Sequence, residues 1–454
     1  MASTAAPRDC PQWRPRSAAT RVRTLLESVL GPDLRLGVRG WDGSYAGPAD
    51  PPALIAVRSP LALRRLVWSP NEVGLARAYV TGDMDVEGDL YSALQFLETR
   101  DAARRLENRS AAHRLFVSAS AVAALRGIGP PLGPPAEEAK GRGLRHSRRR
   151  DAEAIRHHYD VGNDFYRLVL GPSMTYSCAF WPPGTVTLED AQDAKFELIS
   201  RKLDLVPGMR LLDVGCGWGS FATYAARAHG VDVVGVTIPP AQAELARSRA
   251  AAAGVGDRVE IRLQDYRDIA DGPYDAVASI GMSEHVGRSQ LSIYAGRLAA
   301  LLAPQGRLLN SAISRPGRVS GRSGKTFISR YVFPDGELHS VARMIEELET
   351  AGLEVRDVQS LREHYQRTLL CWERNLEERW EQAAALVGLP RARIWRLYMT
   401  ASAVAFGAGR IGVDQVLAVR AAGGVAGMPA SRRHFVLPAR EQPGLRPGPQ
   451  QAVE

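Results

Sequence analysis

The feature that most constrains this chain is a glycine-rich turn directly after a short apolar run. The stretch LLDVGCGWGS begins at Leu211, and its turn holds Gly215, Gly217 and Gly219. The apolar run predicts a strand buried on both faces, and the glycines predict a tight turn into a helix. A side chain at these positions would keep the backbone away from a ligand. We therefore expect a ligand at the carboxyl end of a strand in an open α/β sheet.

The segments after the turn bear on which ligand it holds, because a glycine turn alone also fits a dinucleotide site or a turn that binds nothing. The next apolar run ends in Thr237, and no acidic residue follows it to hold a ribose. Runs at 259–263 and 274–280 continue an alternation of strands and helices, and Glu284 follows the last run. This order resembles the S-adenosylmethionine-dependent methyltransferase fold, a Rossmann-like class I α/β sheet with helices on both faces.

Length, charge and cysteine content narrow the class of protein. The 454 residues suffice for two domains, and the net charge of +9 favours an anionic partner, either nucleic acid or an anionic membrane surface. No stretch reaches the ~18 apolar residues of a membrane span. The four cysteines fit neither a zinc site nor a disulfide framework, so we expect no metal and a reducing cytosol; they are Cys10, Cys178, Cys216 and Cys371.

We expect five segments along the chain, separated by changes in apolar pattern, proline content and charge. They are a disordered N-terminus at 1–19, a smaller mixed α/β domain of lipid-binding type at 20–126, a basic linker at 127–150, the methyltransferase domain at 151–420 and a disordered tail at 421–454. The first domain is predicted to have helices at 61–68, 73–81 and 102–125, strands at 34–38 and 53–57, and a turn at 82–85.

The linker combines prolines with closely spaced lysines and arginines, so we expect no compact element there. Its basic residues, which include Lys140, Arg148 and Arg150, would be attracted to anionic headgroups by roughly 1 kcal/mol each near a membrane surface. The alternative is a connector that is merely solvated.

The second domain carries a series of distinctive motifs in a fixed order. They are HHYDVGNDFY, MTYSCAFW, LLDVGCGWGS, VVGVTIPPAQ, QDYRD, SIGMSEHVG, RYVFPDGELHS and HYQRTLLCWERN, with ARAYVTGDMDVEGDL in the leading domain. In these motifs and their order the chain resembles the cyclopropane-fatty-acyl-phospholipid synthases. The resemblance implies that the methyl of S-adenosylmethionine is transferred to the cis double bond of a phospholipid acyl chain and that closure gives a cyclopropane. It also implies a bound bicarbonate that acts as the base.

The same resemblance implies where each part of the cofactor binds. Glycines would allow the backbone to approach it, and polar or aromatic side chains would surround its amino-acid end, ribose and adenine. These residues are, in that order, Gly215, Gly217 and Gly219 at the turn, Tyr159 and Ser177 at the amino-acid end, Thr237 and Gln242 at the ribose, and Gln264 and Tyr266 near the adenine.

The reaction itself requires an unusual site. An alkene is a weak nucleophile, so a carbocation develops on the acyl chain before a proton leaves. Apolar walls, aromatic faces and a single buried anion meet that need. By the resemblance, Glu284, Cys178, Tyr365 and the backbone near Ile313 hold the bicarbonate, and Cys178 is not a nucleophile.

One position departs from the family pattern. The family usually has a histidine two residues before the residue that matches Ile313, whereas this chain has Ser311. A serine donates a single hydrogen bond and cannot carry charge. Alternation along a strand should point Asn310 to the opposite face, so it is not expected to compensate. Loss of the final proton is therefore in doubt, and a cyclopropane or a methylene-branched chain both stay open as products.

Other functions also stay open. The same fold acts on small soluble substrates, and loss of the histidine is compatible with an inactive lipid-binding protein. Nucleic-acid methylation is disfavoured, because no Asn/Asp-Pro-Pro-Tyr/Phe motif follows the fourth strand. We expect an unsaturated phospholipid in an anionic membrane surface as the partner, no nucleic acid, and a location in the cytoplasm at the inner face of the membrane; a homodimer is left open.

Overall fold

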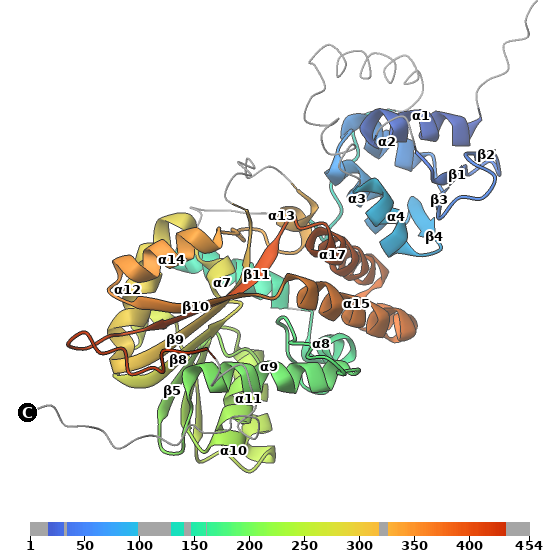
Figure 1. The fold of residues 1–454 in the computed structure, drawn as a ribbon. Helices are drawn as coiled ribbons and strands as arrows, with labels where there is room; N and C mark the ends of the chain where they lie inside the picture. Colours follow the sequence, from blue (N-terminus) through green and yellow to red (C-terminus); the bar gives the residue numbers. More distant parts are fainter. Residues whose placement is uncertain are drawn as a thin grey trace, which may run out of the picture. The chain divides into compact units, whose positions relative to one another are not determined.

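The computed structural model describes residues 17–30, 34–98, 129–139, 147–159, 161–316 and 326–432 (Figure 1). The chain divides into two compact units, 1–136 and 137–454. The division falls inside the segment expected to be a linker. The helix expected at 102–125 lies outside the described residues.

The first unit is a small mixed α/β domain. Its four strands lie in the order β2-β1-β3-β4, with β1 and β3 parallel and the other pairs antiparallel. The turn expected at 82–85 is shorter than predicted: Gly82 and Asp83 form a turn and a bend, whereas Met84–Glu87 forms a strand that pairs with β3. The elements are α1 (Ala18–Leu30), β1 (Gly37–Arg39), β2 (Tyr45–Ala46), β3 (Leu54–Val57), α2 (Leu61–Trp68), α3 (Glu72–Val80), β4 (Met84–Glu87) and α4 (Leu90–Leu97).

The second unit is built on a seven-stranded sheet in the order β10-β11-β9-β8-β5-β6-β7. The five strands from β9 to β7 run parallel, and β11 is antiparallel to both of its neighbours. The chain winds outward from β5 to β7 and then returns to the other side of β5, which creates a topological switch point where ligands bind. The strands are β5 (Arg210–Val214), β6 (Asp232–Thr237), β7 (Val259–Leu263), β8 (Tyr274–Ile280), β9 (Leu302–Ser314), β10 (Glu354–Ser360) and β11 (Gly412–Val419).

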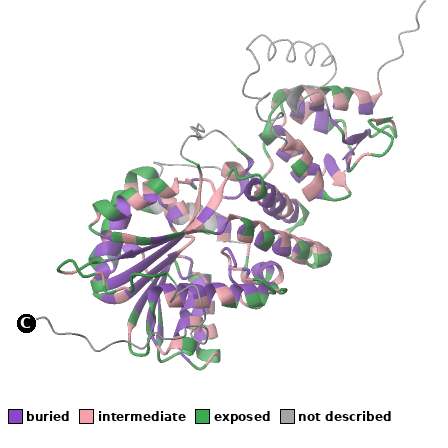
Figure 2. Ribbon diagram, in the orientation of Figure 1, coloured by how far each residue is buried: buried purple, intermediate pink, exposed green. Residues whose placement is uncertain are grey.

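Helices cover both faces of this sheet, and its strands are buried over most of their length (Figure 2). Leu211 packs in a core cluster with α9, α10 and α11, whereas the next residue, Leu212, packs with α12 and α14 on the other face. The predicted fold class is therefore confirmed. The helices are α7 (Arg148–Tyr159), α8 (Asn163–Leu170), α9 (Leu188–Leu203), α10 (Ser220–His229), α11 (Pro240–Ala252), α12 (Leu291–Leu301), α13 (Phe327–Tyr331), α14 (Val341–Thr350), α15 (Arg362–Glu378), α16 (Trp380–Val387) and α17 (Leu389–Gly407).

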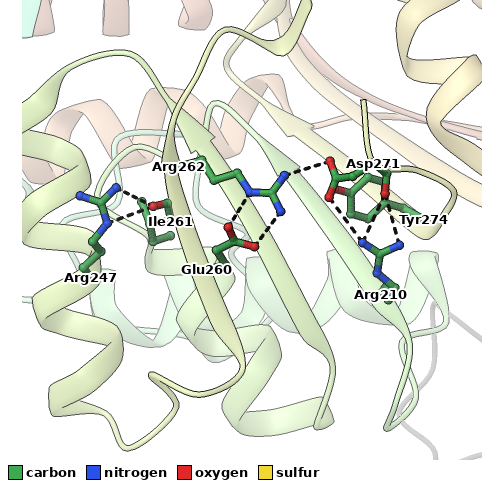
Figure 3. Close-up of polar contacts among 7 residues, drawn as sticks. All are labelled: Arg210, Arg247, Glu260, Ile261, Arg262, Asp271 and Tyr274. Atoms are coloured by element: carbon green, nitrogen blue, oxygen red, sulfur yellow. Dashed lines mark hydrogen bonds and ion pairs between the residues drawn. The ribbon is translucent and has the colours of Figure 1, made fainter. Parts of the chain in front are cut away.

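The edge strand β7 carries a charged network (Figure 3). Arg262 donates to both carboxylate oxygens of Glu260, at 2.8 and 2.7 Å, and to Asp271 at 2.9 Å. Arg210 at the start of β5 forms an ion pair with the same Asp271 at 3.6 Å. Charged side chains on an edge strand oppose pairing with a second sheet. The edge of the sheet at β7 is therefore suited to contact with solvent and not to pairing with another strand.

The expected linker is partly folded. Glu138 is buried and accepts from Arg330 at 3.1 Å, and α7 begins at Arg148. Arg148 and Arg150 form ion pairs with Asp268 and Asp335, at 3.0 and 2.5 Å. The prediction of no compact element is thus wrong for these described residues, because acidic partners distant in sequence neutralise the arginines. Residues 140–146, including Lys140, lie outside the described part.

The boundaries of the two expected disordered ends also differ from the prediction. Helix α1 begins at Ala18, inside the segment expected to be disordered, and 1–16 lie outside the described residues. At the other end, Arg307 donates to the carbonyl of Gly427 at 3.0 Å. Arg432 forms an ion pair with the buried Asp357 at 2.6 Å. Residues 421–432 are therefore held against the sheet. Among the helices the structure describes, none has the length and apolarity that crossing a bilayer needs.

The ion pairs of Asp357 predict a stability effect. Lys202 Nζ lies 3.2 Å from Asp357 Oδ2, and both side chains are almost fully buried. Replacing Asp357→Asn leaves a buried ammonium without its counter-charge, so we expect a loss of about 3 kcal/mol in the free energy of unfolding, measured by urea denaturation.

The control is Glu354→Gln, which removes a carboxylate from an exposed position on the same strand, β10. It should change the unfolding free energy by less than about 0.5 kcal/mol. Equal effects of the two substitutions would contradict the role assigned to the buried pair.

Candidate active site

The glycine turn lies at the carboxyl end of β5. Gly215, Gly217 and Gly219 have φ angles of 79°, 55° and 71°, in a region of backbone conformation that residues other than glycine rarely adopt. The N–H groups of Gly215 and Cys216 both donate to the carbonyl of Val236, each at 3.0 Å, so the turn is fixed against β6. Gly215 is exposed and Gly217 is half-buried, so the backbone at these two residues is open to a ligand, which fits the close approach expected for a cofactor. Gly219 is buried, and a Cβ there would lie 3.0 Å from the Cβ of Ala246, so this glycine allows close packing of the helices.

Residues expected around the ribose and adenine lie at the ends of the next two parallel strands. Thr237 ends β6, and its buried hydroxyl donates to Gln242 Oε1 at 2.9 Å. Gln264 directly follows β7 and donates to the carbonyl of Asp268 at 2.9 Å. Tyr266 comes next and is buried. Because parallel strands end at one edge of the sheet, these side chains share that edge with the glycine turn.

The two residues expected at the amino-acid end reach the turn from other elements. Tyr159 ends α7, and its ring centroid lies 5.9 Å from that of Trp218 inside the glycine turn. Ser177 accepts a hydrogen bond at 3.0 Å from Lys195 of α9. Below the turn, Asp213 Oδ2 is buried and has no hydrogen-bond partner among the described residues. The left-handed glycines and this unsatisfied acceptor fit a cofactor that carries an ammonium group.

Glu284 lies directly beyond β8, in a short helical turn. Its Oε1 accepts from the N–H of Ile313 at 2.8 Å, whereas Oε2 is buried and finds no hydrogen-bond partner within the described chain. Burial raises the pKa of this carboxyl to about 7, and the Ile313 N–H partly opposes the shift. The result is a buried acid–base group with one oxygen available to a ligand.

Two other predicted residues, Cys178 and Tyr365, are also buried. The Cys178 thiol is buried and donates to the carbonyls of Ala179 and Leu361, at 3.2 and 3.7 Å. Burial raises the pKa of the thiol well above its usual range, so it stays neutral and is not a nucleophile. Burial also raises the pKa of Tyr365, and the phenol interacts electrostatically with both Cys178 and Glu284. Tyr365 therefore lies within electrostatic reach of both of the other predicted residues.

Ser311 lies on β9, two residues before Ile313. Its carbonyl accepts from the N–H of Gly281 at 2.8 Å, and its hydroxyl makes no hydrogen bond within the described residues. The neighbouring Asn310 accepts from the Tyr294 hydroxyl at 2.8 Å, among side chains on the other face. The expectation that Asn310 points away is confirmed. No other residue of β9 supplies an imidazole in place of the histidine that the family has at the position of Ser311.

Several aromatic residues at the site were missed by sequence reasoning. The His158 ring stacks between Phe333 and Tyr176, with centroid distances of 4.1 and 5.5 Å. The Tyr176 hydroxyl donates to that of Tyr398 at 3.1 Å, and burial raises the pKa of Tyr398 to about 12. Tyr176 lies in the MTYSC motif and could have been found there. Tyr398 lies on α17, whose sequence pattern indicates only packing.

Two cavities open beside this aromatic cluster. One is lined by residues that include His158, Trp395 and Arg391, and the other by residues that include His285 and Phe333. Burial lowers the pKa of His285 to about 4, so its imidazole is neutral near pH 7. The linings also include Glu137 in the first cavity and Asp151 and Asp335 in the second. Aromatic rings in both linings offer the π faces that stabilise a carbocation.

The sheet order and the turn at its switch point define the class I S-adenosylmethionine-dependent methyltransferase fold. A coclaurine N-methyltransferase bound to N-methylheliamine and SAH has a similar structure, with a TM-score of 0.57 over 76% of this chain and 99% of that chain, at 19% identity. At this identity the likeness concerns the fold alone.

The family follows from closer matches. The family model for mycolic acid cyclopropane synthetase matches residues 146–416, and the chain belongs to this family. A probable fatty acid methyltransferase of Mycobacterium tuberculosis is 44% identical over 394 residues, 84% of this chain and 90% of the relative. The cyclopropane-fatty-acyl-phospholipid synthase of Escherichia coli is 38% identical over 260 residues, 57% of this chain and 66% of the relative.

A crystal structure supports the same assignment. A mycolic acid cyclopropane synthase complexed with SAH and CTAB has a TM-score of 0.56 and 33% identity, over 59% of this chain and 98% of that chain. The resemblance inferred from the motifs is thus confirmed. The chain is an S-adenosylmethionine-dependent methyltransferase of the cyclopropane synthase type.

The environment of Glu284 predicts opposite effects on activity and stability. Glu284→Gln keeps the oxygen that accepts from Ile313 but removes the negative charge of the buried carboxylate, so we expect product formation to fall by about a hundredfold or more. The folded-state pKa of about 7 exceeds the ordinary 4.5, so ionised Glu284 destabilises the fold increasingly as pH rises from 4.5 to 7. At pH 8 the variant should be more stable by about 2 kcal/mol in urea denaturation.

This stability gain should shrink as the pH falls from 7 and should be lost below 4.5, where the carboxyl is protonated in both states. The control is Glu347→Gln, which removes a buried carboxylate that is paired with Arg343 at 2.5 Å. That variant should lose stability and keep its activity. A Glu284→Gln variant that is less stable than the wild type at pH 8 would contradict the assignment of an unsatisfied buried carboxylate.

Proposed function

We propose that the chain transfers the methyl of S-adenosylmethionine to the cis double bond of a phospholipid acyl chain and that the product is a cyclopropane. The observation that carries the proposal is Glu284, a buried carboxylate with one bound and one free oxygen, beside an aromatic cluster. A methyl acceptor with a lone pair needs no such surroundings. An alkene does, because its methylation leaves a cation that must be stabilised and then deprotonated.

The proposed reaction balances as follows. The cofactor supplies an electrophilic methyl on a sulfonium. The π electrons of the alkene form the new C–C bond while the C–S bond breaks and its electrons stay on sulfur. The adjacent alkene carbon becomes positive and lies against the rings of the site. A proton then leaves the added methyl for a base, and the electrons of that C–H bond close the three-membered ring.

Bicarbonate fits as the base. The free Oε2 of Glu284 can accept its O–H group, and the neutral Tyr365 phenol and Cys178 thiol can donate to its other oxygens. The N–H of Ile313 is bound to Glu284, so it holds the carboxylate in place. When bound there, bicarbonate would supply a proton acceptor in a dry site.

We also propose that the enzyme meets its lipid at an anionic membrane surface, on the inner face of the cytoplasmic membrane. The net charge of +9 supports this proposal. Arg148 and Arg150 contribute little, because both are paired with acidic residues of the same unit. The attraction would therefore rest on other basic residues.

A vesicle assay tests the substrate. With methyl-labelled S-adenosylmethionine and vesicles of a cis-monounsaturated anionic phospholipid, we expect acyl chains to gain one CH2 and to resist hydrogenation. Saturated phospholipid vesicles and the Glu284→Gln variant are the controls and should show no gain. Methylation of free oleic acid in preference to the vesicles would contradict the phospholipid proposal.

A methylene-branched product is the second candidate, and Ser311 favours it. Without the positive charge of a histidine, an anion in the site is held less tightly, so the proton leaves more slowly. A hydride shift can then move the cation before a proton is lost from the added methyl, which leaves a methylene branch. A tuberculostearic acid methyltransferase of Mycobacterium tuberculosis is 33% identical over 417 residues, 89% of this chain and 92% of the relative.

Substitution at this position should shift the product ratio. In the vesicle assay, we expect Ser311→His to raise the share of cyclopropane over methylene-branched chains by about threefold or more, because a protonated imidazole holds the anion closer. Ser311→Ala is the matched control, since it removes the hydroxyl and adds no charge. Identical product ratios for all three enzymes, by mass spectrometry before and after hydrogenation, would remove Ser311 from the argument.

A further inference from the structure

Two oppositely charged side chains lie beneath the glycine turn, in the interior of the second unit. Lys195 of α9 and Asp213 of β5 are each only 2% exposed. Asp213 shares the face of β5 that Leu211 presents to α9, because alternate residues of a strand point the same way. Burying either charge alone is unfavourable, so each group needs an opposite charge or polar partners in the interior.

The two groups influence each other through their charges. Burial lowers the pKa of Lys195, and the negative charge of Asp213 counteracts the shift. Burial raises the pKa of Asp213, and Lys195 counteracts that shift in turn. Yet Asp213 Oδ2 accepts no hydrogen bond from any described residue. The carboxylate is therefore compensated in charge but left with a free acceptor.

Lys195 also fixes a residue expected at the cofactor. Its Nζ donates to the Ser177 hydroxyl at 3.0 Å, and Gln192 on the same face of α9 donates to the Ser177 carbonyl at 3.2 Å. An ammonium group can only donate, so Ser177 is the acceptor in this bond. The Ser177 hydroxyl proton is then directed elsewhere and is available to an acceptor on a ligand.

We propose that Lys195 is a positioning residue for the amino-acid end of S-adenosylmethionine and acts through Ser177 and Asp213. That end of the cofactor is a zwitterion. Ser177, turned by Lys195, can donate to its carboxylate, and Asp213 has a free oxygen for its ammonium. This inference rests on the cofactor assignment and not on the lipid substrate.

The test uses two probes, one with and one without the amino-acid end of the cofactor. S-adenosylhomocysteine carries the amino-acid end, and 5′-methylthioadenosine lacks it. In titration calorimetry with the full chain, Lys195→Met should weaken binding of S-adenosylhomocysteine by about tenfold or more, the loss typical of a charge-assisted contact. Its affinity for 5′-methylthioadenosine should stay within about twofold of the wild type, because no contact to the adenosine is removed.

Lys202→Met is the matched control. Lys202 lies two helical turns after Lys195 on the same face of α9, is equally buried, and pairs with Asp357 at 3.2 Å. Its replacement should lower the unfolding midpoint and leave the affinity ratio of the two probes unchanged. The comparison separates loss of a buried lysine from loss of the contact to Ser177.

A Lys195→Met variant that keeps the wild-type ratio of affinities would overturn the proposal, and so would one that weakens both probes equally. If Lys195→Met does not fold, the double variant Lys195→Met with Asp213→Asn removes both charges and leaves none unpaired. It should fold and bind S-adenosylhomocysteine no better than 5′-methylthioadenosine; tighter binding of the former overturns the proposal. Wild-type enzyme that binds S-adenosylhomocysteine but leaves vesicles unmethylated would contradict the lipid reaction alone.

Discussion

The hydrogen bond from the Ile313 N–H to Glu284 is the interaction on which the proposed chemistry depends. It joins the segment after β8 to the end of β9, two parallel neighbours in the sheet, at 2.8 Å. A buried carboxylate is unfavourable, and a single N–H donor offsets only part of that energy, so the pKa stays raised. The bond also orients the group, because one oxygen is occupied and the other is left to face a ligand. The neutral thiol and phenols around it then act as donors, not as competing bases.

Most of the sheet could be predicted because local pattern and tertiary structure agree there. The apolar runs at β5, β6 and β8 are buried on both faces, so their composition alone indicates strands, whereas the edge strand β7 shows an alternation of buried and exposed residues. Strand β11 could not be predicted, since its place between β9 and β10 follows from antiparallel pairing with strands distant in sequence. The structure of residues 421–432, which were predicted to be disordered, was missed for a similar reason. Its anchors, Arg307 and Asp357, are ordinary charged residues in the sequence and become anchors only through burial.

The site residues also fall into those that could be predicted from the sequence and those that could not. Glu284 and Ile313 lie in motifs, and their contact across 29 residues follows from the parallel order of β8 and β9. Lys195 and Tyr398 gave no such signal, because each lies on a helix whose pattern is fully explained by packing. Strand alternation placed Asn310 correctly on the far face, since that inference needs only the two-residue period. Geometry that depends on one element is readable from sequence, and geometry that depends on three is not.

The effect of Ser311 on the proposed reaction depends on which charged groups lie near Glu284 when the histidine is absent. Near Glu284, burial keeps the Cys178 thiol and the Tyr365 phenol neutral, and His285 is neutral because its pKa falls to about 4. No cation among these neighbours replaces the histidine that the family places on β9. An anion beside Glu284 therefore meets one carboxylate and several dipoles, so it is held more weakly and its proton affinity is higher. Weaker holding lengthens the life of the carbocation, whereas higher proton affinity shortens it. The product then depends on which of the two effects is larger, and that balance is set by one side chain.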